Sequence, residues 1–350
     1  MPLHTSQFLV FLTITALIGG LTYWKCRGAR SESQSKSSEN KEYFLAGGGL
    51  TWVFVAGSIT LTNLSTDQLV GMNGSQMAIF AWWEFAAVVG LCILALVFIP
   101  VYYKYNCTTT TELLEKRYDD KHIRAAISSL FLFGNLFLFL PAVLYTGSLF
   151  MMEMFALSPD MGWSGGTIYL IAAAFAAVGA CYAIFGGLRA VAVSDTYSGV
   201  LLLGMAILVT FLALKAINFD FTGIPKERLS MIGDSSSPVP FATLFTGMIF
   251  IQIFYWSTNQ TITQRAMASP STREAQKGVF AAAAIRLFIV PPIIVLPGIV
   301  AYKLYGDIGD TAYGRIVQDL LPGGTAGILA AAIAAAVLTT FNSILNSSAA

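Results

Sequence analysis

Residues 52–74 read WVFVAGSITLTNLSTDQLVGMNG, an apolar run of membrane-spanning length with a polar middle. Within it, residues 60–68 carry hydroxyl, amide and carboxylate side chains where a lipid-facing helix would carry apolar ones. Backbone groups in hydrocarbon must be satisfied internally, so such a break is tolerated only beside a cavity or other protein. We expect this span to unwind and to line an ion and solute site. A short re-entrant turn or a polar seam between helices is the alternative.

The rest of the chain has the composition of a membrane protein. Only 11% of its 350 residues are charged and 56% are hydrophobic, whereas a soluble domain carries about 25% charged residues. A membrane-spanning helix needs about 20 mostly apolar residues. Nine such segments can be read, at 7–24, 52–71, 78–103, 125–151, 166–186, 190–214, 241–261, 279–302 and 324–350. We therefore expect an all-α transmembrane fold, with residues 1–350 forming one domain in the lipid bilayer.

The positive charges alternate between the two sides of these spans. Fourteen Lys and Arg residues fall in the connections on one side and five on the other, and only Arg286 lies inside a span. Because Lys and Arg favour cytoplasmic loops, the pattern predicts an N-terminus outside the cell and a cytoplasmic loop at residues 25–51. The predicted location is the cell membrane, with several passes.

Other functional classes find little support in the sequence. A net charge of +1 without a basic patch argues against nucleic acid as a partner. Neither histidine, His4 or His122, lies in a span, and the four cysteines form no paired motif, so we expect no enzyme. A channel would need a continuous polar pore, whereas the polar residues cluster at one depth. No obligate protein partner is evident.

Charged and polar residues also interrupt other spans. Glu84 lies in the third span and Arg286 in the eighth. Ionisable groups at this depth cost about 2.5–3.5 kcal/mol each and usually mark a pathway, so we expect the two to offset each other's charge. A glutamate that reaches the interface, or a purely structural pair, is the alternative. In the seventh span STNQ (257–260) nearly repeats STDQ (65–68), as in transporters with matching broken helices.

The ninth span offers oxygen atoms to a cation. Ala336, Thr339 and Thr340 lie within one helical turn and supply one carbonyl and two hydroxyls. Sodium is a hard cation and takes several oxygen ligands. Threonine hydroxyls in membrane helices also bond back to the preceding turn, which is the alternative. Asp195 begins the sixth span on the cytoplasmic side, where it is either interfacial or part of a cation exit.

Eight motifs, in order, resemble those of the sodium/solute symporter family, in the branch of the sodium/glucose and sodium/galactose cotransporters. They are KEYFLAGGGLTW (41–52), TNLSTDQLVGMNG (62–74), TTTELLEKRYDDK (109–121), VLYTGSL (143–149), YAIFGGLRAVAVSDT (182–196), YWSTNQTITQR (255–265), AQKGVFAAAAIRL (275–287) and TTFNSILNSSA (339–349). The resemblance implies an inverted-repeat fold, five helices plus five, preceded by one extra helix. On that mapping residues 7–24 are the extra helix, 52–214 the first repeat and 241–350 an incomplete second repeat. It also implies a C-terminally truncated member.

The resemblance implies a sodium site and a solute site. The sodium ligands it implies are the carbonyls of Leu61, Leu64 and Ala336 and the hydroxyls of Thr339 and Thr340. The solute-binding residues it implies are Asn63, Gln68, Glu84, Gln252 and Arg286. The gate residues are Trp83, Tyr255 and Trp256, and sodium leaves past Asp195. The sugar carriers usually have lysine at the position of Arg286, and the galactose carrier has serine at that of Ala87, which weakens the hexose assignment.

The sequence therefore predicts a sodium-coupled symporter that imports a small polar solute, in first place a sugar, with sodium as the co-transported ion. A sodium-coupled carrier of a carboxylate, polyol or vitamin is the alternative. No arginine lies in the middle of the fourth span to clamp a carboxylate, which favours a neutral, polyhydroxylated solute. A solute sensor on the same fold, without transport, is the other alternative.

Overall fold

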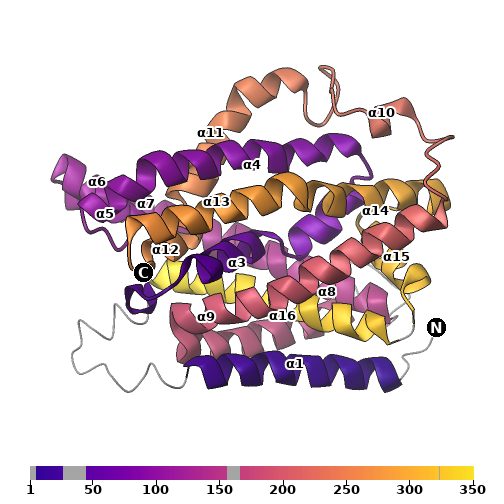
Figure 1. Ribbon diagram of the computed structural model, residues 1–350, viewed down its shortest axis with the longest axis horizontal. Helices are drawn as coiled ribbons and strands as arrows, with labels where there is room; N and C mark the ends of the chain where they lie inside the picture. The colour runs from indigo at the N-terminus through magenta and orange to yellow at the C-terminus, as the bar shows by residue number, and fades with distance from the viewer. Residues whose placement is uncertain (1–4, 27–44, 156–165, 323) are drawn as a thin grey trace.

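The computed structural model describes residues 5–26, 45–155, 166–322 and 324–350. Throughout these ranges the chain forms helices joined by turns and loops, without a strand (Figure 1). The expectation of an all-α fold is confirmed. Most of the expected cytoplasmic loop, residues 27–44, lies outside the described ranges.

The helices fall into two groups along the chain. The first group consists of α1 (Thr5–Cys26), η2 (Ala46–Gly48), α3 (Trp52–Asn63), η3 (Asp67–Met72), η4 (Ala78–Ala81), α4 (Trp82–Ile93), η5 (Leu94–Phe98), α5 (Ile99–Lys104), α6 (Thr110–Tyr118), α7 (Lys121–Gly134), η6 (Asn135–Phe139), α8 (Leu140–Phe155) and α9 (Gly166–Ala216). The second consists of α10 (Lys226–Leu229), η7 (Phe241–Phe245), α11 (Gly247–Ile253), η8 (Phe254–Thr258), α12 (Gln260–Met267), α13 (Thr272–Phe288), α14 (Val290–Tyr305), η9 (Gly309–Thr311), α15 (Ala312–Leu320) and α16 (Thr325–Ala349).

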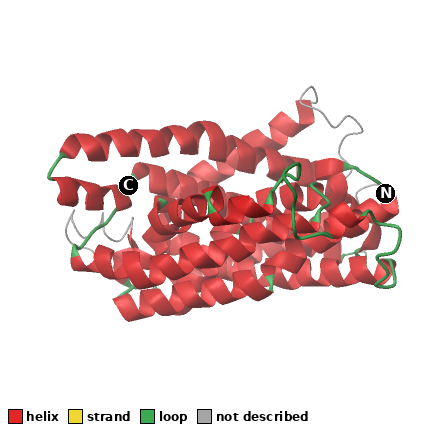
Figure 2. Cartoon of the chain, turned by 90° about the horizontal axis from the view of Figure 1, so that it is seen from above, coloured by secondary structure: helices red, strands yellow, loops and turns green. Residues whose placement is uncertain are grey.

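Five helical stretches of the described chain are long and apolar enough to cross a membrane. They are Ala78–Lys104, Lys121–Phe155, Leu188–Ala216, Thr272–Tyr305 and Thr325–Ala349. Two shorter apolar helices, Leu9–Trp24 and Gly166–Cys181, and two interrupted spans, α3–η3 and α11–α12, account for the other four expected segments. Most of these helices lie along one common axis (Figure 2).

The fifth and sixth expected spans form one secondary-structure element, α9, and not two separate helices. A Cβ built on Gly179 would lie 2.6 Å from the ring of Phe341 on α16. Asp195 pairs with Arg265, which also contacts Ser343 on α16. A straight helix would separate Gly179 from Asp195 by about 24 Å, so α9 doubles back between them. Its two arms correspond to the two expected spans.

The helix break predicted for the second span is confirmed. α3 ends at Asn63, and Leu64 has non-helical backbone angles (φ −77°, ψ 76°). Helical structure resumes in η3, a π-helix that begins at Asp67. The polar residues that mark this break in the sequence therefore lie where the backbone leaves the α-helix.

The seventh span is interrupted at the matching place. α11 passes into the π-helix η8, and Asn259 has an extended backbone (φ −72°, ψ 121°) before α12 begins. The Asn259 side chain caps α12 by accepting a hydrogen bond of 3.0 Å from the backbone N–H of Thr261. The near repeat of STDQ and STNQ in the sequence thus coincides with two helix breaks.

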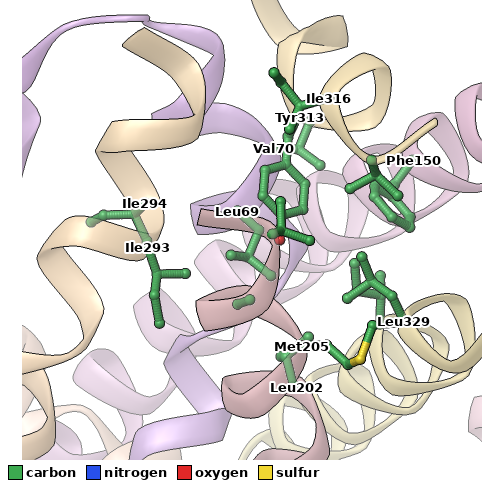
Figure 3. Packing of buried hydrophobic residues seen from close by; sticks show 14 of the residues in the cluster. Leu69, Val70, Phe150, Leu202, Met205, Ile293, Ile294, Tyr313, Ile316 and Leu329 are labelled. Carbon is green, nitrogen blue, oxygen red and sulfur yellow. The ribbon is translucent and has the colours of Figure 1, made fainter. Parts of the chain in front are cut away.

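Two apolar clusters meet at the break in the second span. The large cluster joins α8, α9, α14, α15 and α16, and it takes in Leu69 and Val70 of η3 (Figure 3). The small cluster joins α4, η5, α12 and α13, and it takes in Val55 and Ile59 of α3. The first part of α3 therefore packs into the small cluster, whereas Leu61, Leu64 and η3 pack into the large one, so the broken span passes from one core to the other near Thr60.

Candidate ion and solute site

The unwound segment exposes a backbone carbonyl to its surroundings. The N–H of Ser65 donates to the carbonyl of Asn63 at 2.9 Å, whereas in a continuing helix it would donate to Leu61. Leu61 thereby loses its usual helical donor, as a sodium ligand requires. Leu64 carries the non-helical backbone angles and is fully buried. Both predicted carbonyl ligands lie at the end of α3.

α16 brings two buried threonines to the same region. Thr340 is almost fully buried, and its hydroxyl has no hydrogen-bond partner. The hydroxyl of Thr339 donates back to the carbonyl of Ala336 at 3.2 Å, as the alternative interpretation held. Thr339 is also within hydrogen-bonding reach of Asp195, whose carboxylate accepts from Thr62 on α3 at 3.5 Å. The threonine pair and the end of α3 therefore share a neighbour.

The predicted solute residues form a buried network around one charge pair. Gln68 donates to Oε1 of Glu84 at 2.5 Å. Arg286 forms a fully buried salt bridge to Oε2 of Glu84 and donates to the carbonyl of Thr60 at 3.1 Å. The expectation that Glu84 and Arg286 offset each other is confirmed. A buried pair of this kind removes the net charge but does not by itself stabilise the fold.

The predicted gate residues contact this network. The guanidinium of Arg286 lies 4.4 Å from the ring centre of Trp256. Gln252 accepts from the indole N–H of Trp256 at 2.8 Å and donates to the carbonyl of Trp83 at 3.3 Å. The side-chain amide of Gln252 therefore holds two aromatic residues in place. Asn63 donates to the hydroxyl of Tyr255 at 2.8 Å.

Several polar atoms in this region are buried without a protein partner. Among the described residues around the charge pair they are Thr60 Oγ1, Asn63 Oδ1, Gln68 Oε1 and Arg286 Nε. Buried polar groups are normally hydrogen-bonded, so these four atoms could bond to a polar ligand beside the ion pair. Two amide oxygens accept hydrogen bonds, one guanidinium N–H donates, and the hydroxyl does either.

Asp195 and Arg265 form a second buried ion pair that the sequence interpretation missed. Both side chains are fully buried at an N···O distance of 3.7 Å. Ser58 donates to Asp195 at 2.6 Å and accepts from Nε of Arg265 at 2.7 Å. Hydropathy ends the seventh span at residue 261 and thereby leaves Arg265 outside it. In the structure α12 continues to Met267 and carries Arg265 inside.

A comparison with known proteins identifies the family. The sequence pattern of the sodium:solute symporter family (SSF) matches residues 43–350. The chain belongs to this family. Its relatives include an uncharacterized symporter, YidK, of Escherichia coli (strain K12), 38% identical over 99% of this chain and 62% of YidK. A sodium/glucose cotransporter of Vibrio parahaemolyticus is 33% identical over 98% of this chain and 67% of its own length.

A more distant relative and a solved structure are also similar to this chain. The sodium/myo-inositol cotransporter 2 of Mus musculus is 28% identical over 91% of this chain and 52% of its own length. The structure of a sodium-coupled sialic acid symporter in a substrate-bound, outward-open state superposes with a TM-score of 0.79 at 18% identity, over 99% of this chain and 72% of that one. The chain is thus a multi-pass membrane protein with the symporter fold, and its relatives are transporters and not enzymes.

The chain spans between about half and two thirds of the length of the curated relatives it matches. The motifs by which the sequence resembles the family lie within the matched range or just before it. The family assignment predicted from those motifs is confirmed.

Proposed function

We propose that this protein is a sodium-coupled symporter that imports a small, neutral, polyhydroxylated solute by alternating access. The observation that carries the proposal is the break after Asn63, which takes the usual helical donor from the carbonyl of Leu61, together with the buried, unpaired hydroxyl of Thr340 on α16. Sodium needs a cage of oxygens, and an unwound membrane helix beside a hydroxyl-bearing helix is a way to build one. The family and its sodium/glucose cotransporter relative support sodium as the co-transported ion.

The solute site supports a neutral ligand. Glu84 and Arg286 cancel each other, and both terminal nitrogens of the arginine are already engaged. A solute carboxylate would find no free guanidinium fork, which is the usual partner for that group. Hydroxyl groups, in contrast, can donate to the amide oxygens of Asn63 and Gln68 and accept from Nε of Arg286. A sugar or a cyclic polyol fits this set.

The division into two apolar clusters supports a movement of one cluster against the other at the site. The small cluster takes helices from both expected repeats, α3 and α4 from the first and α12 and α13 from the second. We therefore infer that the first part of α3, with α4, α12 and α13, moves as one body against the large cluster. Tyr255, bonded to Asn63 beside the break, would yield as the site opens inward. Sodium would then leave past Asp195.

The orientation in the membrane, the location and the bounds of the two repeats belong to the same proposal. We place the N-terminus outside and the protein in the cell membrane, following the distribution of Lys and Arg. We also keep residues 52–214 as the first repeat and 241–350 as part of the second. Cysteine labelling from either side of sealed membranes, at an introduced Asp234→Cys or Tyr118→Cys, would test the orientation. Labelling of both from the same side would contradict it.

Uptake into proteoliposomes tests the transport proposal. The panel holds D-glucose, D-galactose, myo-inositol, sialic acid and a short-chain carboxylate, each with an inward sodium gradient and with potassium in its place. We expect sodium-dependent, saturable uptake of at least one neutral polyhydroxylated compound and none of the short carboxylate. Preference for carboxylates would contradict the solute class. Binding of a compound without any uptake would favour the sensor, and uptake without saturation a channel.

A further inference from the structure

We propose that Arg286 is a positioning residue that couples the solute site to the sodium site by bridging the two halves of the broken span. The inference rests on the sodium-coupled transport proposed above, and it concerns the means of coupling. It starts from the second contact of the arginine, to a backbone carbonyl, which a pairing with Glu84 alone would not require.

The bridge consists of four groups in a row. Gln68, after the break, donates to Glu84 at 2.5 Å. Glu84 accepts from Nη1 of Arg286, and Nη2 of Arg286 donates at 3.1 Å to the carbonyl of Thr60, before the break. We call this row, Gln68–Glu84–Arg286–Thr60, the clamp. All four residues are buried, so water does not compete for these bonds.

The clamp encloses the predicted carbonyl ligands of sodium. Leu61, in the last turn of α3, and Leu64, directly after that helix, lie between its two ends along the chain. Leu61 and Leu64 pack into the large cluster with Leu69, whereas Ile59, just before Thr60, packs into the small cluster. The clamp connects Thr60, where the span passes from one cluster to the other, to Gln68 and thereby sets where the two carbonyls lie.

The clamp also carries the atoms open to a solute. Oε1 of Gln68 and Nε of Arg286 are buried and unpaired. A solute that bonds to them fixes the orientation of both side chains and tightens the row of bonds between the halves of the span. Because coupling between two ligands is reciprocal, sodium bound at the carbonyls must in turn favour the arrangement that binds the solute.

The geometry requires arginine in particular. Its planar guanidinium points two terminal nitrogens in different directions, one to Glu84 and one to Thr60. The ring of Trp256, 4.4 Å from the guanidinium carbon, packs against the group. Lysine has one compact ammonium on a flexible stem. Arg286→Lys therefore keeps the charge opposite Glu84 and gives up the bond to Thr60.

Hydrogen exchange in the sodium-free protein tests the clamp itself. In choline buffer we expect the backbone amides of residues 61–68 to exchange about tenfold faster in Arg286→Lys than in the wild type, the effect of losing one bond from a charged donor. Exchange along α16 should stay unchanged. The matched control is Arg315→Lys, since Arg315 pairs with Asp319 on the half-exposed surface of α15. Equal exchange in both variants would overturn the clamp.

Sodium titration, followed by tryptophan fluorescence without any solute, tests the coupling. We expect Arg286→Lys to bind sodium about tenfold more weakly and Arg315→Lys to bind it as the wild type does. Gln68→Met cuts the clamp at its other end without removing a charge, and we expect the same direction of change. Wild-type affinity in both clamp variants would overturn the inference. A wild type that binds no sodium would instead overturn the proposed function.

Discussion

At the scale of single residues, a substitution of Thr340 gives the most direct test of the proposed sodium site. Its hydroxyl is buried and has no partner, whereas that of Thr339 already bonds to Ala336. Such a hydroxyl costs free energy unless something binds it. The two neighbouring threonines therefore differ in what their removal does to the protein without sodium.

We expect Thr340→Ala to weaken sodium binding about tenfold, because a polar contact to a charge contributes about 1.5–3 kcal/mol. Thr339→Ala should weaken it in the same direction. Sodium titration of solute uptake measures both. Thr340→Ser keeps the hydroxyl and should behave as the wild type. Unchanged sodium affinity in both alanine variants would remove the site.

The pair of Glu84 and Arg286 gives a second prediction at this scale. Glu84→Leu leaves the buried arginine uncompensated and should lower the free energy of unfolding by about 3–5 kcal/mol. The double variant Glu84→Leu/Arg286→Met removes both charges and should regain most of that loss. Both variants should fail to bind solute. Thermal unfolding in detergent compares them, and a single variant as stable as the double would contradict a buried charge pair.

At the scale of elements, close backbone packing holds α4 against the broken seventh span. A Cβ on Gly90 would lie 2.5 Å from the carbonyl oxygen of Gln252 and 3.0 Å from Cβ of Trp256. The hydroxyl of Ser257 also donates to the carbonyl of Gly90 at 2.9 Å. Glycine at this position lets the two backbones approach and thereby positions Trp256, the predicted gate residue.

We expect Gly90→Ala to separate these elements, to lower stability by about 1–3 kcal/mol through overpacking, and to weaken solute binding. Gly204→Ala is the control, because no heavy atom lies within 4 Å of a Cβ at Gly204 on α9. That substitution should be neutral or slightly stabilising. Thermal unfolding and solute binding measure the contrast. Equal behaviour of the two variants would show that the contact is unimportant.

The loop after α9 is joined to α14 by a contact that depends on pH. The backbone N–H and hydroxyl of Thr222, and then Lys303, lower the pKa of Asp220 from 3.8 to about 2. The contribution of this contact to stability is thus complete above pH 4 and is lost as the pH falls through about 2. We expect Asp220→Asn to lower the unfolding temperature slightly and equally from pH 5 to 8.

The control for this prediction is Asp234→Asn, whose carboxylate bonds only to serines of its own loop in the described contacts. Asp234→Asn should leave the attachment of the loop to α14 intact. If Asp220→Asn still lowered the unfolding temperature by the same amount at pH 2, the destabilisation would not come from the loss of the ionised carboxylate.

The sequence predicts the helix breaks better than the helix ends. Polar tetrapeptides inside apolar spans mark both breaks because few other arrangements tolerate them in hydrocarbon. The end of the seventh span was placed too early, since hydropathy falls where a buried polar helix continues. Arg265 was missed for that reason. The buried carboxylate of Asp195 was the available signal, because a charge inside a membrane protein needs a partner.

At the scale of the whole molecule, the sequence predicts the fold class and the family but not how the elements are divided between two packed cores. Val55 and Leu69 belong to one predicted span and pack into different clusters. Only tertiary contacts reveal that division, because both clusters use the same apolar residue types. Likewise, only the contacts with α16 show that the two arms of α9 run back along each other.

The proposed solute class also depends on the arrangement of the whole network. The sequence supplies the residues of the network, and the structure adds which of their atoms are engaged. Gln252, expected to bind solute, uses its amide to hold Trp83 and Trp256. Arg286 stands where the sugar carriers that the sequence resembles usually have lysine. Both of its terminal nitrogens donate to groups of the protein, one to Glu84 and one to Thr60. A ligand that needs a free cation is therefore disfavoured.

Solute accumulation driven by membrane potential tests the central claim most directly. Proteoliposomes with equal sodium inside and outside receive an inside-negative potential of about 100 mV and the neutral compound that the panel identifies. One sodium ion per solute releases about 2.3 kcal/mol at that potential, enough for about forty-fold accumulation. The account predicts accumulation that rises with the potential and vanishes when choline replaces sodium. Equal uptake with and without sodium, or at zero potential, would contradict it.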